Sequence, residues 1–180
     1  MASVAAGYAL FDNNGYVDCW RTATIPMQIK LSLSQTLTDG TSQSESVRQA
    51  MLAWNPYLGA VQFDPQVLAQ SSSYVNGNGI NEIVMAADLN GQEFGSGTLA
   101  VTLFRSGSVQ EADIVFNTAY TWDSFRGSRP FDNGFQDIQR VAIHELGHVL
   151  GLDHPDQHGQ SVTAIMNSTP IRKPMIGPRK

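Results

Sequence analysis

Apolar and polar residues alternate near the start of the chain with the two-residue period of a β-strand. Between Ile25 and Leu33 the apolar positions fall on one face, which predicts a half-buried strand. Further short apolar segments bounded by turn-forming residues also predict strands: 83–87, 99–104 and 112–116.

Two other segments have the three-to-four-residue spacing of a helix. The first, over 42–54, opens with Ser42 and Glu45 in the spacing of a capping box, in which each side chain satisfies a free backbone N–H. The second covers about 135–150 and carries an apolar stripe, and Gly151 stands where a left-handed cap would end it.

The order of these elements is strand, helix, several strands, helix and an irregular tail. This order predicts an α+β fold in which helices pack on a mixed sheet. A chain of 180 residues that is 42% hydrophobic and 15% charged can bury a core, so we expect a single domain over 1–180.

Composition excludes several classes of protein. The 11 basic residues are scattered and 16 acidic ones outnumber them, so we expect no nucleic-acid partner. No apolar run approaches the ~20 residues of a membrane span, and no signal-peptide pattern is visible. The single cysteine, Cys19, excludes an intrachain disulfide and a Cys-rich zinc site.

All four histidines lie within 144–158. His144 and His148 are four residues apart, so on a helix they project side by side and can bind one tetrahedral zinc. Glu145 is rotated about 100° from His144 and can reach a water at the open coordination position.

A zinc site of this kind needs a third ligand, and no glutamate follows Glu145. The downstream candidates are Asp153, His154, Asp156 and His158. His154 fits best, because Gly151 lets the chain leave the helix with positive φ and return a side chain three residues later. We interpret His158 as a loop histidine.

The spacing His-Glu-x-x-His-x-x-Gly-x-x-His over 144–154 is the metzincin signature, and the chain resembles a matrixin-type metzincin zinc endopeptidase. The likeness also covers 46–54, 97–100, 113–117 and 164–166, whereas Pro155 is closer to the serralysin branch. The resemblance implies a mostly parallel, twisted sheet. It also implies an upper subdomain (1–151) above the zinc cleft and a short, irregular lower one (152–180), which we expect to be either truncated or reduced.

The resemblance assigns roles to five residues. His144, His148 and His154 would be zinc ligands, and Met166 the methionine of the Met-turn. Glu145 would be the general base for a metal-activated water that hydrolyses peptide bonds.

The same resemblance implies a seat for an extended protein substrate. Leu99 and Ala100 would bind it through their backbones, with Pro170 and Ile171 as the opposite wall.

Other family features are missing. Val101 and Val115 stand where matrixins have histidines for a structural zinc, so we expect one catalytic Zn²⁺ only. Asn117 and Tyr120 replace calcium ligands, and the acidic segment 88–93 is interpreted as an Asn-Gly turn, so calcium is not supported.

The resulting hypothesis is a secreted, monomeric zinc endopeptidase, with secretion inferred from the resemblance alone. Two alternatives remain: a non-catalytic, zinc-stabilised binding module, and a non-peptide amide hydrolase on the same site. Glu145 argues against the binding module, because metal binding does not need it. Cys19 lacks the flanking residues of the family's latency switch, so we interpret it as an inert thiol.

Overall fold

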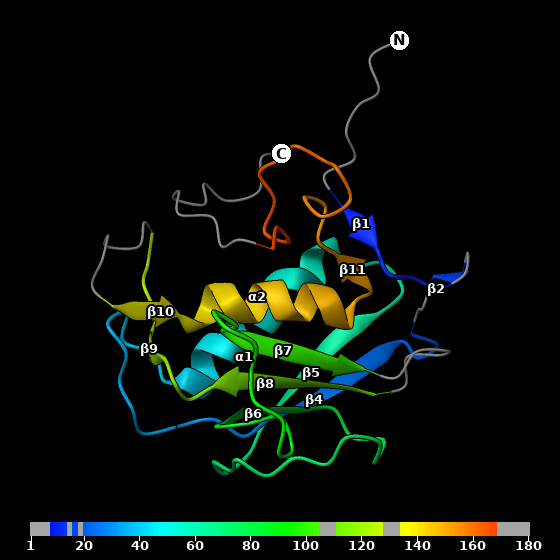
Figure 1. Ribbon diagram of the computed structural model, residues 1–180. Helices are drawn as coiled ribbons and strands as arrows, with labels where there is room; N and C mark the ends of the chain where they lie inside the picture. Colours follow the sequence, from blue (N-terminus) through cyan, green and yellow to red (C-terminus); the bar gives the residue numbers. More distant parts are fainter. Residues whose placement is uncertain (1–7, 14–15, 18–19, 105–110, 128–133, 169–180) are drawn as a thin grey trace.

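The computed structural model describes residues 8–13, 16–17, 20–104, 111–127 and 134–168 (Figure 1). Its centre is a five-stranded sheet in the order β5-β4-β6-β8-β7. The strands are β4 (Thr24–Ile29), β5 (Gln62–Val67), β6 (Glu82–Ala86), β7 (Ala100–Phe104) and β8 (Ala112–Asn117). All neighbours pair in parallel except β7 with β8, which confirms the mostly parallel mixed sheet.

One sheet prediction needs correction, and one strand was missed. The strand expected over 25–33 ends at Ile29, and Leu33 is 56% exposed. The chain leaves the sheet there because Ser44 at the start of the next helix donates to the carbonyls of Leu31 and Ser32. The edge strand β5 was not predicted, since Pro65 interrupts it; an edge strand tolerates proline.

The first helix, α1 (Gln43–Trp54), begins as predicted at Ser42, whose hydroxyl accepts from the Glu45 N–H at 3.1 Å. The capping box is only half formed. The carboxylate of Glu45 accepts instead from Arg48 at 2.7 and 2.8 Å. A short 3₁₀ turn, η1 (Asn55–Tyr57), follows α1.

The second helix, α2 (Ile138–Val149), begins three residues later than expected. Residues Phe135–Asp137 form β10 instead, which pairs in parallel with β9 (Thr121–Asp123). Asp137 then caps the helix, because its carboxylate accepts from the backbone N–H of Arg140 at 3.2 Å. Gly151 follows the helix with φ of 88°, as its position predicts.

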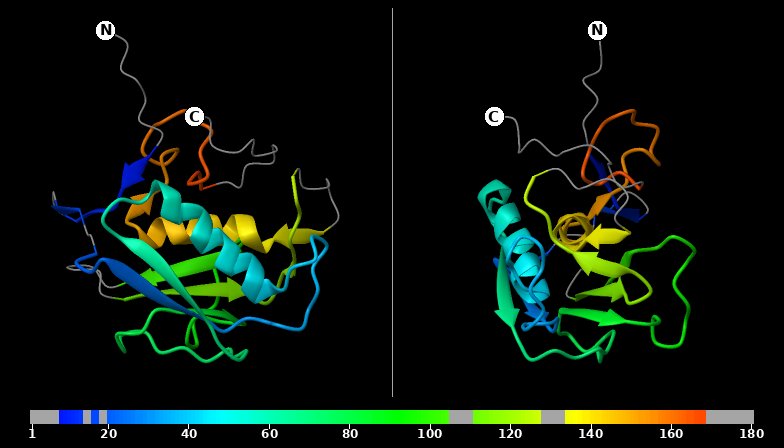
Figure 2. Two further views of the ribbon diagram at one scale, coloured as in Figure 1. Left: turned by 180° about the vertical axis from the view of Figure 1, so that it is seen from behind. Right: turned by 90° about the vertical axis from the view of Figure 1, so that its left-hand side faces the viewer.

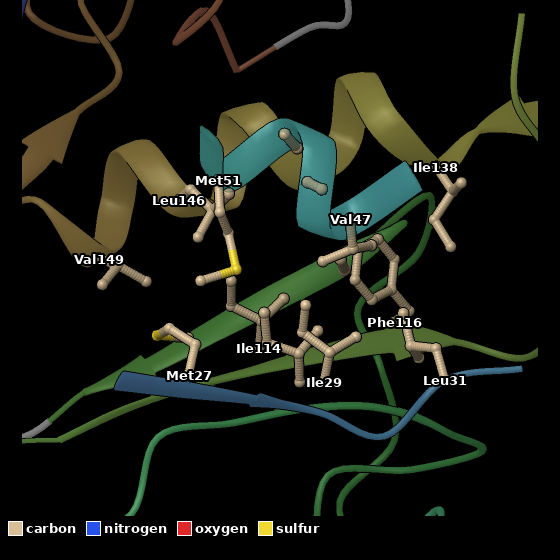
Figure 3. Close-up of a cluster of buried hydrophobic side chains, with 14 of the residues drawn as sticks. Met27, Ile29, Leu31, Val47, Met51, Ile114, Phe116, Ile138, Leu146 and Val149 are labelled. Carbon is tan, nitrogen blue, oxygen red and sulfur yellow. The ribbon is translucent and has the colours of Figure 1, made fainter. Parts of the chain in front are cut away.

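Both helices cover one face of the sheet and pack against each other (Figures 1 and 2). The space between helices and sheet is filled by apolar side chains (Figure 3). The fully buried ones include Met27, Ile29, Val47, Met51, Ile114, Phe116, Ile138 and Leu146. The predicted apolar faces of β4, α1 and α2 therefore meet in one core.

The chain beyond α2 is tied to the N-terminal segment. The strand β11 (Leu152–Asp153) pairs antiparallel with β1 (Ala9–Leu10), while β2 (Asp12–Asn13) pairs with β3 (Tyr16–Val17). Residues 154–168 form turns without helix or strand, and the division into two subdomains stays a prediction. No helix within the described ranges has the length and apolarity of a membrane span.

Candidate metal centre

Three imidazole rings meet at the C-terminal half of α2. The Nε2 atom of His148 lies 3.0 Å from that of His144 and 3.1 Å from that of His154. The Nε2 atoms of His144 and His154 are also 3.1 Å apart. Three ring nitrogens from two segments of chain thus surround one point.

Local backbone structure explains this convergence. His144 and His148 stand one turn apart on α2, and Gly151 turns the chain back with positive φ. Pairing of β11 with β1 then fixes the direction of the returning chain just before His154. A turn closed by the Gln157 N–H on the His154 carbonyl, at 3.1 Å, holds the third ring in place.

Each ring has an oxygen acceptor at Nδ1. His144 Nδ1 lies 2.8 Å from the carbonyl of Ile165, and His148 Nδ1 lies 2.8 Å from that of Leu152. His154 Nδ1 is 3.3 Å from Oε1 of Gln157. Because a proton on Nδ1 satisfies each acceptor, every Nε2 presents a lone pair to the other two.

Three converging lone pairs repel one another unless a cation lies between them. A tetrahedral zinc with Zn–N bonds of ~2.0–2.1 Å separates its ligand nitrogens by ~3.3 Å, close to the observed spacing. Burial lowers the pKa of His148 to about 4, with a further contribution from His144, and burial also lowers the pKa of His144. Both rings are therefore neutral at pH 7, the form that binds metal, and the site fits zinc.

Glu145 lies on the same helix and is only 6% exposed. Its Oε2 accepts from the hydroxyl of Thr102 on β7 at 2.7 Å. Burial raises the pKa of Glu145 to about 7, against the opposing effects of the Thr102 hydrogen bond and the His154 ring. A carboxyl with a pKa near neutrality can both accept and release a proton.

Met166 lies against α2 and is 2% exposed. The residue before it, Ile165, supplies the carbonyl that orients His144. The segment 164–166 therefore packs against α2 beside the histidine cluster, and its role as the Met-turn stays a prediction.

The other candidate ligands do not join the cluster. His158 Nε2 lies 2.8 Å from the carboxylate of Asp153, and Asp156 accepts from the N–H and hydroxyl of Ser168. Within the described ranges, His144, His148 and His154 form the only group of three or more side chains close enough to share a metal.

The expected substrate-binding residues are only partly covered by the structure. Ala100 begins the edge strand β7, while the carbonyl of Leu99 already accepts from the Asn117 N–H at 2.9 Å. Pro170 and Ile171, and also Cys19, lie outside the described residues.

The positions where matrixins have histidines for a structural zinc, and the acidic segment 88–93, have the following surroundings. Val101 pairs in register with Val115, which packs with Tyr74 and Val84 on the sheet face away from the helices. In the segment 88–93, the carboxylate of Asp88 accepts from the Gly91 N–H at 2.7 Å, and Asn90 has φ of 53°. This is the predicted Asn-Gly turn.

Sequence reasoning did not find Thr102 or Gln157. Thr102 is 43 residues from Glu145, and only the packing of β7 on α2 brings them together. Gln157 had a weak local signal, since it follows His154 by three residues inside a turn.

Comparison with known families decides the affiliation. The sequence pattern of the matrixin family matches residues 20–174. The chain belongs to the matrixin family. A search among curated proteins finds no match. Matrixins are zinc-dependent metalloendopeptidases that act on peptide substrates and are commonly extracellular. The matched range contains the three clustered histidines, Glu145 and Met166.

Proposed function

We propose that this matrixin is an active endopeptidase that hydrolyses peptide bonds in extended protein substrates. The proposal rests on one observation above all: three Nε2 atoms lie 3.0–3.1 Å apart, and the buried carboxylate of Glu145 is on the helix that carries two of these histidines. We further propose that the protein is a secreted monomer with a single catalytic zinc. Its one domain would consist of two subdomains.

His144, His148 and His154 would hold the zinc through Nε2, and Met166 would support them by packing against Gly147 of α2. When bound, zinc supplies a Lewis acid that polarises a carbonyl and lowers the pKa of a coordinated water toward ~7. The carbonyls of Ile165 and Leu152 keep two of the rings in the tautomer that this role requires.

Glu145 would move the proton. Its Oε2 is engaged by Thr102, and its Oε1 has no hydrogen bond from the part of the chain that the structure describes. Oε1 is then the atom that takes the proton of the attacking water and passes it to the nitrogen of the leaving amine.

The free edge of β7 would seat the substrate. Among the described residues β7 ends the sheet and pairs only with β8, so its other side offers backbone groups to an added strand. The Leu99 carbonyl faces β8, so pairing through the carbonyls begins with Ala100. Pro170 and Ile171 are proposed as the opposite wall.

The test is cleavage of casein by the zinc-loaded protein, with zinc content measured on each variant. Glu145→Ala is expected to keep its zinc and lose about 100-fold or more of the rate. His148→Ala is expected to lose zinc as well. His158→Ala is the matched control, because His158 is outside the cluster. This variant should keep both its zinc and its cleavage rate.

The alternatives predict other results. A binding module would bind zinc without cleaving casein, and an amide hydrolase would cleave small amides only. Full activity of Glu145→Ala, or cleavage that survives complete removal of zinc by a chelator, would refute the proposed mechanism.

A further inference from the structure

We propose that Thr102 is a positioning residue that holds the general base, and that it ties this base to the strand on which the substrate lies. The inference rests on the proposed function and adds to it a residue outside the metzincin signature. Its basis is the contact between the Thr102 hydroxyl and the carboxylate of Glu145, 2.7 Å from Oγ1 to Oε2.

The contact is well placed to fix the carboxylate. The same hydroxyl lies 3.1 Å from the backbone carbonyl of Glu145, so its one proton faces two acceptors of this residue, and Oε2 is the nearer of the two. Glu145 is 6% exposed, which leaves little solvent to compete for Oε2. With Oε2 held, Oε1 is the oxygen left to receive a proton.

Thr102 is itself rigid. It pairs with Ile114 of β8 in the ladder, and β7 packs against α2. A β-branched side chain in a strand has few χ1 states, so the hydroxyl position follows from the backbone. The distance from this hydroxyl to α2 is therefore set by the packing of strand on helix.

The backbone N–H and C=O groups of Thr102 lie in the plane of the sheet and point toward its free edge, whereas the side chain points toward α2. In an antiparallel pair, successive residues direct their N–H and C=O groups alternately toward and away from the partner strand. Leu99 directs its carbonyl to Asn117 of β8, so Ala100 and Thr102 direct theirs to the open side. One residue thus offers its backbone to an extended peptide and its hydroxyl to the base.

This arrangement makes a specific kinetic prediction. Loss of the hydroxyl leaves the backbone of β7 intact, so substrate binding should persist while proton transfer suffers. Thr102→Val keeps the shape of the side chain and removes only the hydrogen bond. We expect kcat to fall about 10- to 100-fold, with KM and zinc content nearly unchanged. Thr102→Ser, which keeps the hydroxyl, should have a kcat within a fewfold of the wild-type value.

Thr121→Val is the matched control, because Thr121 is exposed on β9. A second readout needs neither zinc nor activity, because it is the urea unfolding midpoint of the metal-free protein. Thr102→Val should lower this midpoint less in a Glu145→Ala background than in the wild-type background. Thr102→Ala serves in the same two measurements if the valine variant does not fold.

Unchanged kcat in Thr102→Val, or a rise in KM at constant kcat, would overturn the positioning role. So would equal effects of Thr102→Val with and without Glu145. These results differ from failure of the proposed function, which would appear as an active Glu145→Ala enzyme.

Discussion

Met166 occupies the space that a side chain on Gly147 would need. A Cβ atom on Gly147 would lie 2.9 Å from Cε of Met166 and closer still to its sulfur. Glycine inside a helix costs about 1 kcal/mol relative to alanine, so its presence in α2 has a packing reason. The glycine between the two helical histidines and the methionine 19 residues later are therefore one structural unit.

Gly147→Ala is expected to destabilise the protein by about 1–3 kcal/mol, because Met166 or the helix must shift to admit the methyl group. In a Met166→Ala background the obstacle is gone, and the same change should be neutral or stabilising. Urea unfolding of the two single variants and the double variant measures this coupling. Additive effects would contradict the packing explanation.

The parts of the site that could be predicted depend on short-range geometry. The spacing of His144 and His148 on a helix and the turn at Gly151 require no knowledge of the rest of the fold. The cap at Ser42 is similar, since it depends only on the next few residues. Local sequence determines these contacts, so local reasoning finds them.

The parts that could not be predicted depend on pairing over long distances. Nothing near Thr102 indicates that its hydroxyl meets Glu145, and β5 owes its place to β4 rather than to its own polar sequence. The start of α2 was wrong for the same reason, because Phe135–Asp137 pairs with β9. Leu33 continues the alternating pattern, but the strand ends before it because the Ser44 N–H at the start of α1 donates to the Ser32 carbonyl.

Asp113 should make stability depend on pH. Its side chain is fully buried on β8; one oxygen accepts from the Glu82 N–H at 2.9 Å, and the other has no partner in the described ranges. Burial raises the pKa of Asp113 from 3.8 to about 7, and the charges of Glu111 and Glu82 add to this effect.

The folded protein therefore keeps a proton that the unfolded chain releases above pH ~4. Stability from this group is present at low pH and is lost as pH rises toward 7, by about 4 kcal/mol at most. Asp113→Asn keeps the acceptor for Glu82 and should gain stability relative to the wild type at pH 8 but not at pH 4. Urea unfolding at both pH values, with exposed Asp64→Asn as control, measures the difference; an equal gain at both would refute it.

The pairing of β1 with β11 should help the protein to retain zinc. Leu10 is in register with Leu152, whose carbonyl orients His148, and the Phe11 N–H donates to the Gly151 carbonyl at 2.9 Å. The Phe11 ring also lies 5.5 Å from the His148 ring.

Deletion of residues 1–11 should weaken zinc binding about tenfold, the lower range for loss of support around a ligand. Deletion of residues 1–7 is the control, since it leaves β1 in place. Competition with a zinc-binding dye measures the affinity. Equal affinities of the two deletions would show that β1 does not support the site.

Two tryptophans donate to α2, and their loss should have unequal effects. Trp20 Nε1 donates to the carbonyl of Val149 at 2.7 Å, and Trp54 Nε1 donates to that of Ile143 at 3.0 Å. The Val149 carbonyl is in the last turn, where helical carbonyls have no partner within the helix, whereas the Ile143 carbonyl also accepts from Gly147 in the regular helical pattern. Trp20→Phe should therefore cost about 1–3 kcal/mol beyond lost packing, and Trp54→Phe about 1 kcal/mol or less. Denaturant unfolding of the two variants measures which of them loses more free energy of unfolding. A larger loss for Trp54→Phe would show that packing, not the helix-end carbonyl, decides the outcome.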